Sequence, residues 1–256
     1  MKLEVLFTPA EFAALASRDL RETACVVFDV LRATSTVVTA LHNGAKEIIP
    51  VAEISEALEI KKSESRIQNP ESILLGGERD GVKISAAQTG GIDFDLGNSP
   101  REYTPGKVRG KTIVSTTTNG TRALRACAGA KAVLAASFLN LGATAEFLRR
   151  NRFASILLVC AGTGENAALE DTLAAGALCD VLSGGFGAGA NPASVETARR
   201  AYAQAKSNLA GAMRDSENAR RLLENPALRG DVAFCLQRDT CPMIARMDAN
   251  GAIRRA

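Results

Sequence analysis

The chain has 256 residues, of which 46% are hydrophobic and 23% charged, and its formal net charge is +3. This length suffices for one large domain, and so weak a charge, without a basic stripe of interleaved aromatics, argues against nucleic-acid binding. No apolar run approaches the roughly 18 residues of a membrane span, and the N-terminal MKLEVLF lacks signal-peptide anatomy, so we expect a cytoplasmic protein without a membrane partner.

Aromatic residues make up only 4% of the chain and Trp is absent, which indicates a core of small and branched aliphatic side chains. None of the six cysteines forms a CxxC pair, and most lie in apolar runs; they are Cys25, Cys127, Cys160, Cys179, Cys235 and Cys241. We expect buried structural thiols in a reducing compartment.

Predicted strands alternate with predicted helices along the chain. In order, we expect a strand at Leu3–Phe7, a helix at Pro9–Leu15, a strand at Ala24–Phe28, a helix at Ser35–His42, a strand at Glu47–Val51, a helix at Ile54–Lys62, strands at Ile73–Leu75 and Thr112–Val114, a helix from about Ala123, a strand at Ala132–Ala135, a helix at Asn140–Arg150, a strand at Ser155–Cys160, helices at Leu169–Leu182, Pro192–Leu209 and Glu217–Leu223, and a last strand at Asp231–Leu236.

This alternation predicts a three-layer α/β/α fold with a largely parallel sheet in a single domain, 1–256. It is compatible with two structurally similar halves, about 1–110 and 111–256. The stretch Asp80–Pro105 is irregular and is either a functional loop or contains a small hairpin, and Ser183–Ala190 reads as a glycine-rich loop.

The stretch Lys111–Thr121, KTIVSTTTNGT, predicts a strand, a hydroxyl-rich turn and the start of a helix. Ligands of open α/β sheets gather at such turns, and the free N–H groups at a helix start favour an anion. An ordinary helix N-cap is the alternative, but so many hydroxyls with Asn and Gly exceed what a cap requires. We expect the anion to contact Thr116, Thr117, Thr118, Asn119, Gly120 and Thr121.

Charged residues recur at or near other strand ends: Asp29 with Arg32, Glu78 with Arg79, and Glu170 with Asp171 one turn into a helix beyond the loop Gly162–Asn166. A carboxylate directly after a fully apolar strand is costly unless it is solvated, paired or bound to metal. The acids are hard oxygen ligands suited to Mg²⁺, and guanidinium groups match phosphate, sulfonate or carboxylate. Structural roles, as N-caps, first-turn acids or ion pairs, are the alternative for each.

His42 is the only histidine and lies late in a predicted helix, away from a strand end. This excludes a His-based triad and any zinc site that needs two histidines. The sequence contains no GxSxG, GxxxxGK[ST] or GxGxxG motif, and the aspartate-nucleophile signature DxDx[TV] fails at Asp29, where the text reads DVLRAT.

The segments FDVLRATSTVVTAL, GGERDGVKI, FDLGNSPREYTP, GKTIVSTTTNGTRAL, VCAGTG and LEDTLAAGAL occur in an order that resembles the 2-phosphosulfolactate phosphatase family. The resemblance covers about residues 24–182, with a further match in DVAFCLQRDT. It implies a Mg²⁺-dependent phosphatase that hydrolyses (R)-2-phospho-3-sulfolactate to 3-sulfolactate and phosphate. In methanogens this step belongs to coenzyme M biosynthesis.

On this resemblance we expect some of Asp29, Glu78, Glu170 and Asp171 to hold Mg²⁺. The expected catalytic residues are Asp29, Arg32, Glu78 and Arg79. The expected substrate-binding residues are Asn98, Ser99 and Thr116–Thr121, which we call the threonine loop. Asp29 could attack phosphorus, or a carboxylate could position a water; the missing DxDx[TV] signature favours the water route.

Two segments depart from the family pattern: Ser85–Asp93 looks like an insertion, and Asn166–Ala168 stands where the family tends to have an aromatic residue and Ser. Two other functions stay open. The chain could be a phosphatase of another small phosphorylated hydroxy acid, or a non-catalytic anion-binding α/β protein. The Ala-rich late helices would permit a homodimer.

Overall fold

A computed structural model describes residues 2–64, 72–182 and 192–256. The strands are β1 Lys2–Leu6, β2 Thr23–Phe28, β3 Glu47–Pro50, β4 Ile73–Arg79, β5 Val82–Lys83, β6 Thr112–Thr116, β7 Ala132–Ala136, β8 Ser155–Cys160, β9 Ala245–Met247 and β10 Ile253–Arg255. The α-helices are α1 Pro9–Ala13, α2 Ala33–His42, α3 Ile54–Glu64, α4 Ala86–Thr89, α5 Pro105–Val108, α6 Gly120–Ala126, α7 Leu141–Arg150, α8 Leu169–Leu182, α9 Ala193–Ala205, α10 Leu209–Ala212, α11 Glu217–Glu224 and α12 Arg229–Cys235. Short 3₁₀ turns complete the described chain, and the expected loop Ser183–Ala190 lies outside it.

The ten strands form one sheet in the order β1-β8-β2-β7-β9-β10-β3-β6-β4-β5. Strands β1, β8, β2 and β7 pair in parallel and make up the β2 group; β3, β6 and β4 pair in parallel and make up the β6 group. The hairpin β9–β10 joins the two groups through three antiparallel pairings. The predicted largely parallel sheet is therefore confirmed, and each parallel group takes strands from both sides of residue 110.

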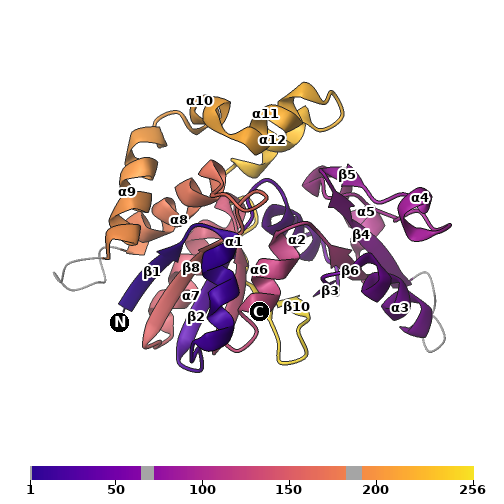
Figure 1. The fold of residues 1–256 in the computed structure, drawn as a ribbon, viewed down its shortest axis with the longest axis horizontal. Helices are drawn as coiled ribbons and strands as arrows, with labels where there is room; N and C mark the ends of the chain where they lie inside the picture. Colours follow the sequence, from indigo (N-terminus) through magenta and orange to yellow (C-terminus); the bar gives the residue numbers. More distant parts are fainter. Residues whose placement is uncertain (1, 65–71, 183–191) are drawn as a thin grey trace.

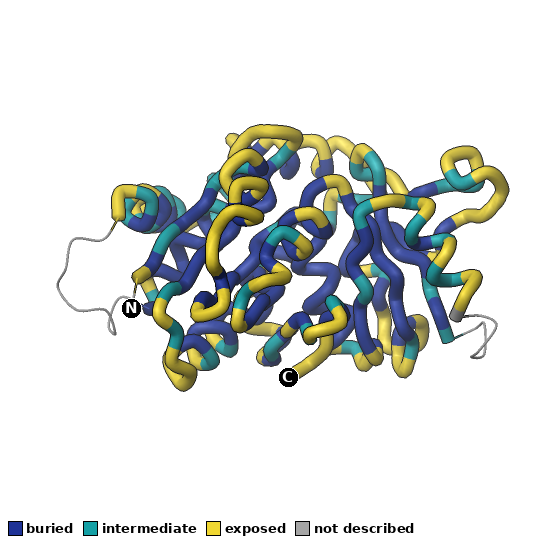
Figure 2. The backbone as a smooth tube through the Cα atoms, turned by 60° about the horizontal axis from the view of Figure 1, so that its bottom comes forward, coloured by how far each residue is buried: buried dark blue, intermediate teal, exposed yellow. Residues whose placement is uncertain are grey.

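Strand β2 shows why the fold needs three layers. Ala24, Val26 and Phe28 pack in one hydrophobic cluster with residues of α7, α8 and α9, whereas Cys25 and Val27 pack in a second cluster with residues of α1, α2 and α6. Successive side chains of a strand point to opposite faces, so a fully apolar strand requires helices on both sides. Figure 2 shows the strands as a buried band bordered by exposed segments.

Strand β4 is longer than predicted. The segment Gly76–Arg79, expected to leave the strand, continues it and pairs with β6 and then with β5. Asp80 and Gly81 form the turn of this hairpin, with φ of 53° and 79°. Two consecutive positive φ values suit the Asp-Gly pair of a tight hairpin turn. A small hairpin is thus present, but only its turn and second strand lie within 80–105; its first strand is the end of β4, which places Glu78 inside a strand.

The expected strand at Asp231–Leu236 is wrong, because Arg229–Cys235 forms helix α12. Val232 and Cys235 are the buried apolar residues of this segment, at helical spacing. Strands β9 and β10 were not expected. Each has only three residues, too few for a clear alternation of apolar and polar side chains.

Figure 1 shows α10, α11 and α12 together above the sheet, with β1, β8 and β2 on one side and β3, β6 and β4 on the other. Among the described helices, none is both long and apolar enough to span a membrane.

Candidate active site

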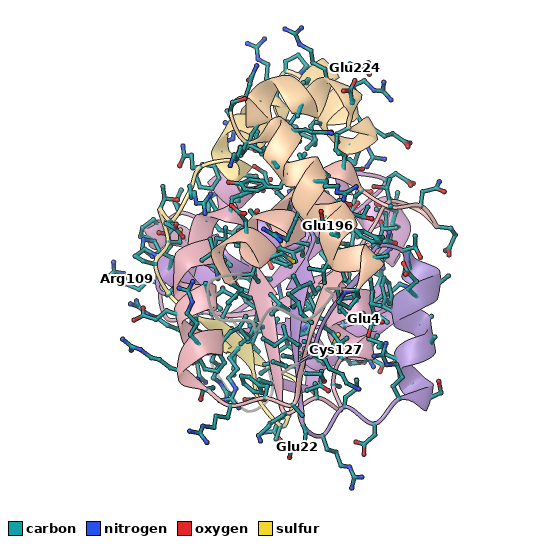
Figure 3. All side chains as sticks on the ribbon, turned by 90° about the vertical axis from the view of Figure 1, so that its left-hand side faces the viewer. Glu4, Glu22, Arg109, Cys127, Glu196 and Glu224 are labelled. Atoms are coloured by element: carbon teal, nitrogen blue, oxygen red, sulfur yellow. The ribbon has the colours of Figure 1, made fainter. Side chains whose placement is uncertain are left out.

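A cavity of about 330 Å³ lies between the carboxyl ends of the two strand groups and α11. In Figure 3, Glu22, next to the start of β2, and Glu224, the last residue of α11, lie at opposite ends of the molecule, so β2 runs toward α11. The cavity is lined by Asp29, Leu31, Arg32, Glu78, Asp80, Gly81, Asn98, Thr118, Asn119, Gly162, Thr163, Gly164, Asn166, Glu217, Asn218, Arg221 and Leu222.

Asp29 follows β2 directly and lines this cavity. Its Oδ1 accepts a hydrogen bond from the N–H of Ala33, the first residue of α2, at 3.0 Å. No donor among the described residues reaches its Oδ2. Burial raises the pKa of Asp29 to about 7, and the negative charges of Glu78 and Glu170 add to that shift. Asp29 thus offers one open carboxylate oxygen in a site that disfavours its charge.

Gly120, the first residue of α6, provides the room for Asp29. A methyl group on Gly120 would lie 2.5 Å from Asp29 Oδ2 and 2.5 Å from Ala33 Cβ. The missing side chain therefore lets the Asp29 carboxylate lie against α6. We expected this glycine to admit an anion, and the carboxylate of Asp29 occupies that space instead.

The threonine loop contributes two residues to the cavity lining, Thr118 and Asn119. The Thr118 N–H and hydroxyl donate to Glu78 Oε1 at 2.8 and 3.0 Å, and the Gly81 N–H donates to Glu78 Oε2 at 2.7 Å. Glu78 therefore ties the hairpin of β4 to the loop after β6, with both oxygens engaged. Its position at the end of β4 brings the β6 group to the cavity.

The other threonines of the loop do not line the cavity, and their hydroxyls bond to protein groups. The Thr121 N–H donates to Thr117 Oγ1 at 3.1 Å, and the Thr121 hydroxyl donates to the Thr117 carbonyl at 3.1 Å. Thr116 Oγ1 donates to the Ala52 carbonyl at 3.0 Å. These threonines therefore bond to the protein itself, although Asn119, the N-cap residue of α6, makes no side-chain capping hydrogen bond.

Asp171 and Glu170, at the start of α8, are both buried and neither lines the cavity. Asp171 accepts hydrogen bonds from the N–H groups of Val30 at 2.8 Å and Gly162 at 3.1 Å, so it joins the ends of β2 and β8. Burial, with the neighbouring charges of Asp29 and Glu170, raises the pKa of Asp171 well above its ordinary value.

Glu170 accepts from the Ser216 hydroxyl at 2.7 Å and from Asn218 Nδ2 at 2.6 Å. Ser216 is the N-cap of α11, and its Oγ also accepts from the Ala219 N–H. Glu170 therefore anchors α11 over the cavity.

The two predicted arginines differ in placement. Arg32 lines the cavity, is buried, and donates to Asp231 Oδ2 at 3.0 Å and to the Gly81 carbonyl at 2.7 Å. Arg79 does not line the cavity, because its guanidinium donates to the carbonyls of Glu78 and Ala52 and to Thr116 Oγ1.

Asp231, on α12, was missed because its segment was expected to form a strand. It is fully buried and also accepts hydrogen bonds from Ser99 Oγ at 2.7 Å and Arg101 Nε at 2.8 Å. Ser99 therefore lies behind the cavity, whereas Asn98 lines it. The match of DVAFCLQRDT to the family pattern was the available signal for Asp231.

Arg221 and Asn218 on α11 also line the cavity and were not expected there. Arg221 donates to Asn218 Oδ1 at 3.0 Å. Their helix was predicted, but the sequence gives no sign that it covers the carboxyl ends of distant strands.

The oxygens that lack a hydrogen-bond partner in this site are better candidates for magnesium ligands than the acids whose oxygens are already bonded. Mg²⁺ is usually held by one or two carboxylates together with waters and substrate phosphate oxygens. Asp29 Oδ2 is open, and Asn119 Oδ1 is buried without any hydrogen-bond partner. Both oxygens of Glu78, Glu170 and Asp171 already accept protein hydrogen bonds. Within the described ranges, no three His, Cys, Asp or Glu side chains are arranged to hold a metal.

Comparison with known proteins identifies one family. A family model described as 2-phosphosulpholactate phosphatase matches residues 11–250. A protein of Caldanaerobacter subterraneus named "Probable 2-phosphosulfolactate phosphatase" is 39% identical over 249 residues, covering 97% of both chains. A protein of the same name from Thermotoga maritima is 43% identical over 84% of both chains. Another, from a Synechococcus species, is 38% identical over 91% of this chain and 92% of its own.

Proposed function

Because the chain belongs to the 2-phosphosulfolactate phosphatase family, we propose that it hydrolyses the phosphate ester of (R)-2-phospho-3-sulfolactate to 3-sulfolactate and phosphate. The family makes the chain a phosphoric monoester hydrolase and so favours an enzyme over a non-catalytic anion-binding protein. The observation that supports the proposal most directly is the cavity itself, which is lined by Asp29 and Asn119: no described donor reaches Asp29 Oδ2, and the buried Asn119 Oδ1 has no hydrogen-bond partner.

We propose that Asp29 and Asn119 hold the Mg²⁺ ion. Asp29 and Glu78 line a cavity that must accept a polyanionic substrate, and their charges would repel it. A bound Mg²⁺ would offset this repulsion and stabilise the charge that develops on the phosphoryl oxygens. We expected some of Asp29, Glu78, Glu170 and Asp171 to hold the ion. This proposal keeps Asp29 and adds Asn119, because the other three acids already position backbone and side-chain groups around the cavity.

The protein's own groups would then hold and orient the substrate. Thr118 and Asn119 lie at the start of α6, next to Asp29, and are placed to contact the phosphoryl group. Arg32 and Arg221 supply positive charge in the same cavity. Two routes remain for the attack on phosphorus: the open oxygen of Asp29 attacks directly, or it positions a water that attacks. We favour the water, because the aspartate-nucleophile signature is missing at Asp29.

A phosphatase assay with a panel of substrates tests this function. We expect release of phosphate from (R)-2-phospho-3-sulfolactate with Mg²⁺, loss of release with EDTA, and recovery when Mg²⁺ is restored. Faster turnover of another phosphorylated hydroxy acid, by kcat/KM, would contradict the substrate but leave the reaction class. Turnover that persists in EDTA would contradict the role of the metal.

We further propose that the enzyme acts in the cytoplasm, within sulfolactate or coenzyme M metabolism, and that it forms a homodimer. The place in sulfolactate or coenzyme M metabolism follows from the chemistry of the proposed product. The predominance of buried, unpaired cysteines in the described chain is compatible with a reducing compartment. Size-exclusion chromatography with light scattering tests the dimer.

A further inference from the structure

Two guanidinium groups approach one point of the cavity wall at Gly81, the second turn residue of the β4–β5 hairpin. A methyl group built on Gly81 would lie 3.8 Å from Arg221 Nε and 3.8 Å from Arg32 Nη2. Arg32 comes from the end of β2 and Arg221 from α11, about two hundred residues later in the chain. Like charges this close are unfavourable unless anions offset them.

The charge of Arg32 is already offset inside the protein. Its guanidinium forms an ion pair with Asp231, and the side chains of Arg32 and Asp231 are only 3% and 0% exposed. A buried pair of this kind fixes the guanidinium in one position.

Arg221 is different, because within the described residues its guanidinium donates only to the neutral amide oxygen of Asn218, at 3.0 Å. None of the acids in the described ranges forms an ion pair with it. Arg221 is exposed and lines the cavity, so most of the five N–H donors of its guanidinium stay available to a bound molecule. A guanidinium with free donors binds planar or tetrahedral oxyanions well.

The position of Arg221 is set by a buried chain of hydrogen bonds. Asn218 accepts from Arg221 and donates from Nδ2 to Glu170 Oε1 at 2.6 Å and to Thr163 Oγ1 at 2.5 Å. Glu170 is 1% exposed and lies on α8. These hydrogen bonds explain why the carboxylate of Glu170 is buried: Glu170 holds α11 in place through Asn218 and so orients Arg221 toward the cavity.

We propose that Arg221, beside the fixed charge of Arg32, binds the sulfonate of the substrate and so determines its specificity. This inference rests on the proposed function. In the proposed function the phosphoryl group lies at the start of α6, beside Asp29, Thr118 and Asn119. Arg221 approaches the same cavity from α11. The subsite would accept an acidic group that takes no part in the bond cleavage. Glu170 and Asn218 are positioning residues for it.

The test compares two substrates in two variants. The first substrate is 2-phospho-3-sulfolactate, and the second is 2-phospholactate, which has a hydrogen in place of the sulfonate. Arg221→Gln removes the cation, and Arg220→Gln, at an exposed neighbour on the same helix that does not line the cavity, is the matched control. We expect Arg221→Gln to lower kcat/KM for phosphosulfolactate by about 10- to 100-fold, mainly through KM, and to change that for phospholactate by less than about threefold.

An equal loss on both substrates, or no loss on either, would overturn the subsite while leaving the proposed function intact. If the wild-type protein does not hydrolyse phosphosulfolactate, the proposed function fails. Calorimetric titration with 3-sulfolactate then tests the subsite. Binding that is at least tenfold weaker in Arg221→Gln than in Arg220→Gln supports it. Equal binding by the wild type and Arg221→Gln, or no binding by the wild type, contradicts it. A Glu170→Gln variant should shift KM in the same direction, because it weakens the positioning of Asn218.

Discussion

Asp29 lines the cavity directly after β2, and no donor among the described residues reaches its Oδ2, so it is the residue on which activity should depend most. Removing its charge with Asp29→Asn keeps the shape of the side chain. We expect kcat to fall by at least about 10³-fold, since metal-ion and general-base roles are each of this order. Steady-state phosphate release at saturating Mg²⁺ measures the loss. Asp19→Asn, at an exposed position before β2, is the control. A kcat for Asp29→Asn within tenfold of that of the control would remove Asp29 from the reaction.

The raised pKa of Asp29 also predicts a dependence of stability on pH when no metal is bound. A carboxyl whose pKa is raised by folding, here to about 7, favours the folded state at a pH below its ordinary value near 3.8. That contribution is lost as the pH rises through the interval between the two values. The metal-free wild type should therefore lose stability between pH 4 and 7, relative to an Asp29→Asn variant that cannot titrate there.

Thermal unfolding in EDTA at pH 5 and pH 8 measures this effect. We expect the melting temperature of Asp29→Asn to rise relative to that of the wild type as the pH increases. Parallel changes in the two proteins would show that Asp29 does not titrate in this interval. Asp171 shifts in the same direction, so the difference between the two proteins, and not the wild type alone, is the informative quantity.

At the scale of elements, helix α12 contributes the buried acid on which two other segments converge. Asp231 pairs with Arg32 and also accepts from Ser99 and Arg101. Removing one partner of a buried ion pair leaves the other uncompensated, at a cost of about 3–5 kcal/mol. We expect Asp231→Ala to lower the free energy of unfolding by that amount, measured by urea denaturation of the metal-free protein.

The double variant Arg32→Met with Asp231→Leu separates stability from activity at this site. Replacing both charges with apolar groups of similar volume should recover most of the lost stability. Activity should not recover, because Arg32 lines the cavity. A single-variant loss below about 1 kcal/mol would mean that water reaches Arg32 and compensates it.

The same elements show what the sequence could predict. Long apolar strands such as β2 and β8 and the helices after them were predicted correctly, because burial on both faces leaves a continuous apolar run. Strand β4 was cut short at Gly76, since two glycines read as a break. Gly77, with φ of 147°, is nevertheless paired with Thr116 within the strand ladder. The Asp-Gly pair at 80–81 was the stronger local signal for the hairpin.

At the scale of the whole molecule, the proximity of Asp29, Glu78 and Thr118 was predicted, but not the sheet geometry that produces it. We expected a largely parallel sheet, with these residues at its strand ends. The three successive antiparallel pairings through β9 and β10 instead make the β6 group antiparallel to the β2 group. The cavity lies where the carboxyl ends of the two groups meet. Sheet twist over many strands brings such ends together. Contacts of this kind depend on pairing across more than a hundred residues, which local patterns do not encode, so Arg221 and Asp231 could not be placed from sequence.

The hairpin β9–β10 is, in the described part of the chain, the only link in the sheet between the two parallel groups. Ile253, the first residue of β10, is fully buried and pairs with Ile48 of β3 and Met247 of β9. Ile253→Ala should lower the free energy of unfolding by about 2–5 kcal/mol, through lost burial and the cavity left behind. Because the cavity is formed by residues of both groups, kcat/KM should also fall, although Ile253 does not line it.

Urea denaturation followed by circular dichroism, together with steady-state kinetics below the transition, tests both effects. Arg255→Ala, an exposed residue of the same strand, is the control and should change stability by less than about 0.5 kcal/mol. If Ile253→Ala is destabilised as expected but keeps full activity in the folded protein, the hairpin supports the core without aligning the two groups. If the two variants lose equal stability, the pairing of Ile253 with Ile48 and Met247 does not hold the groups together.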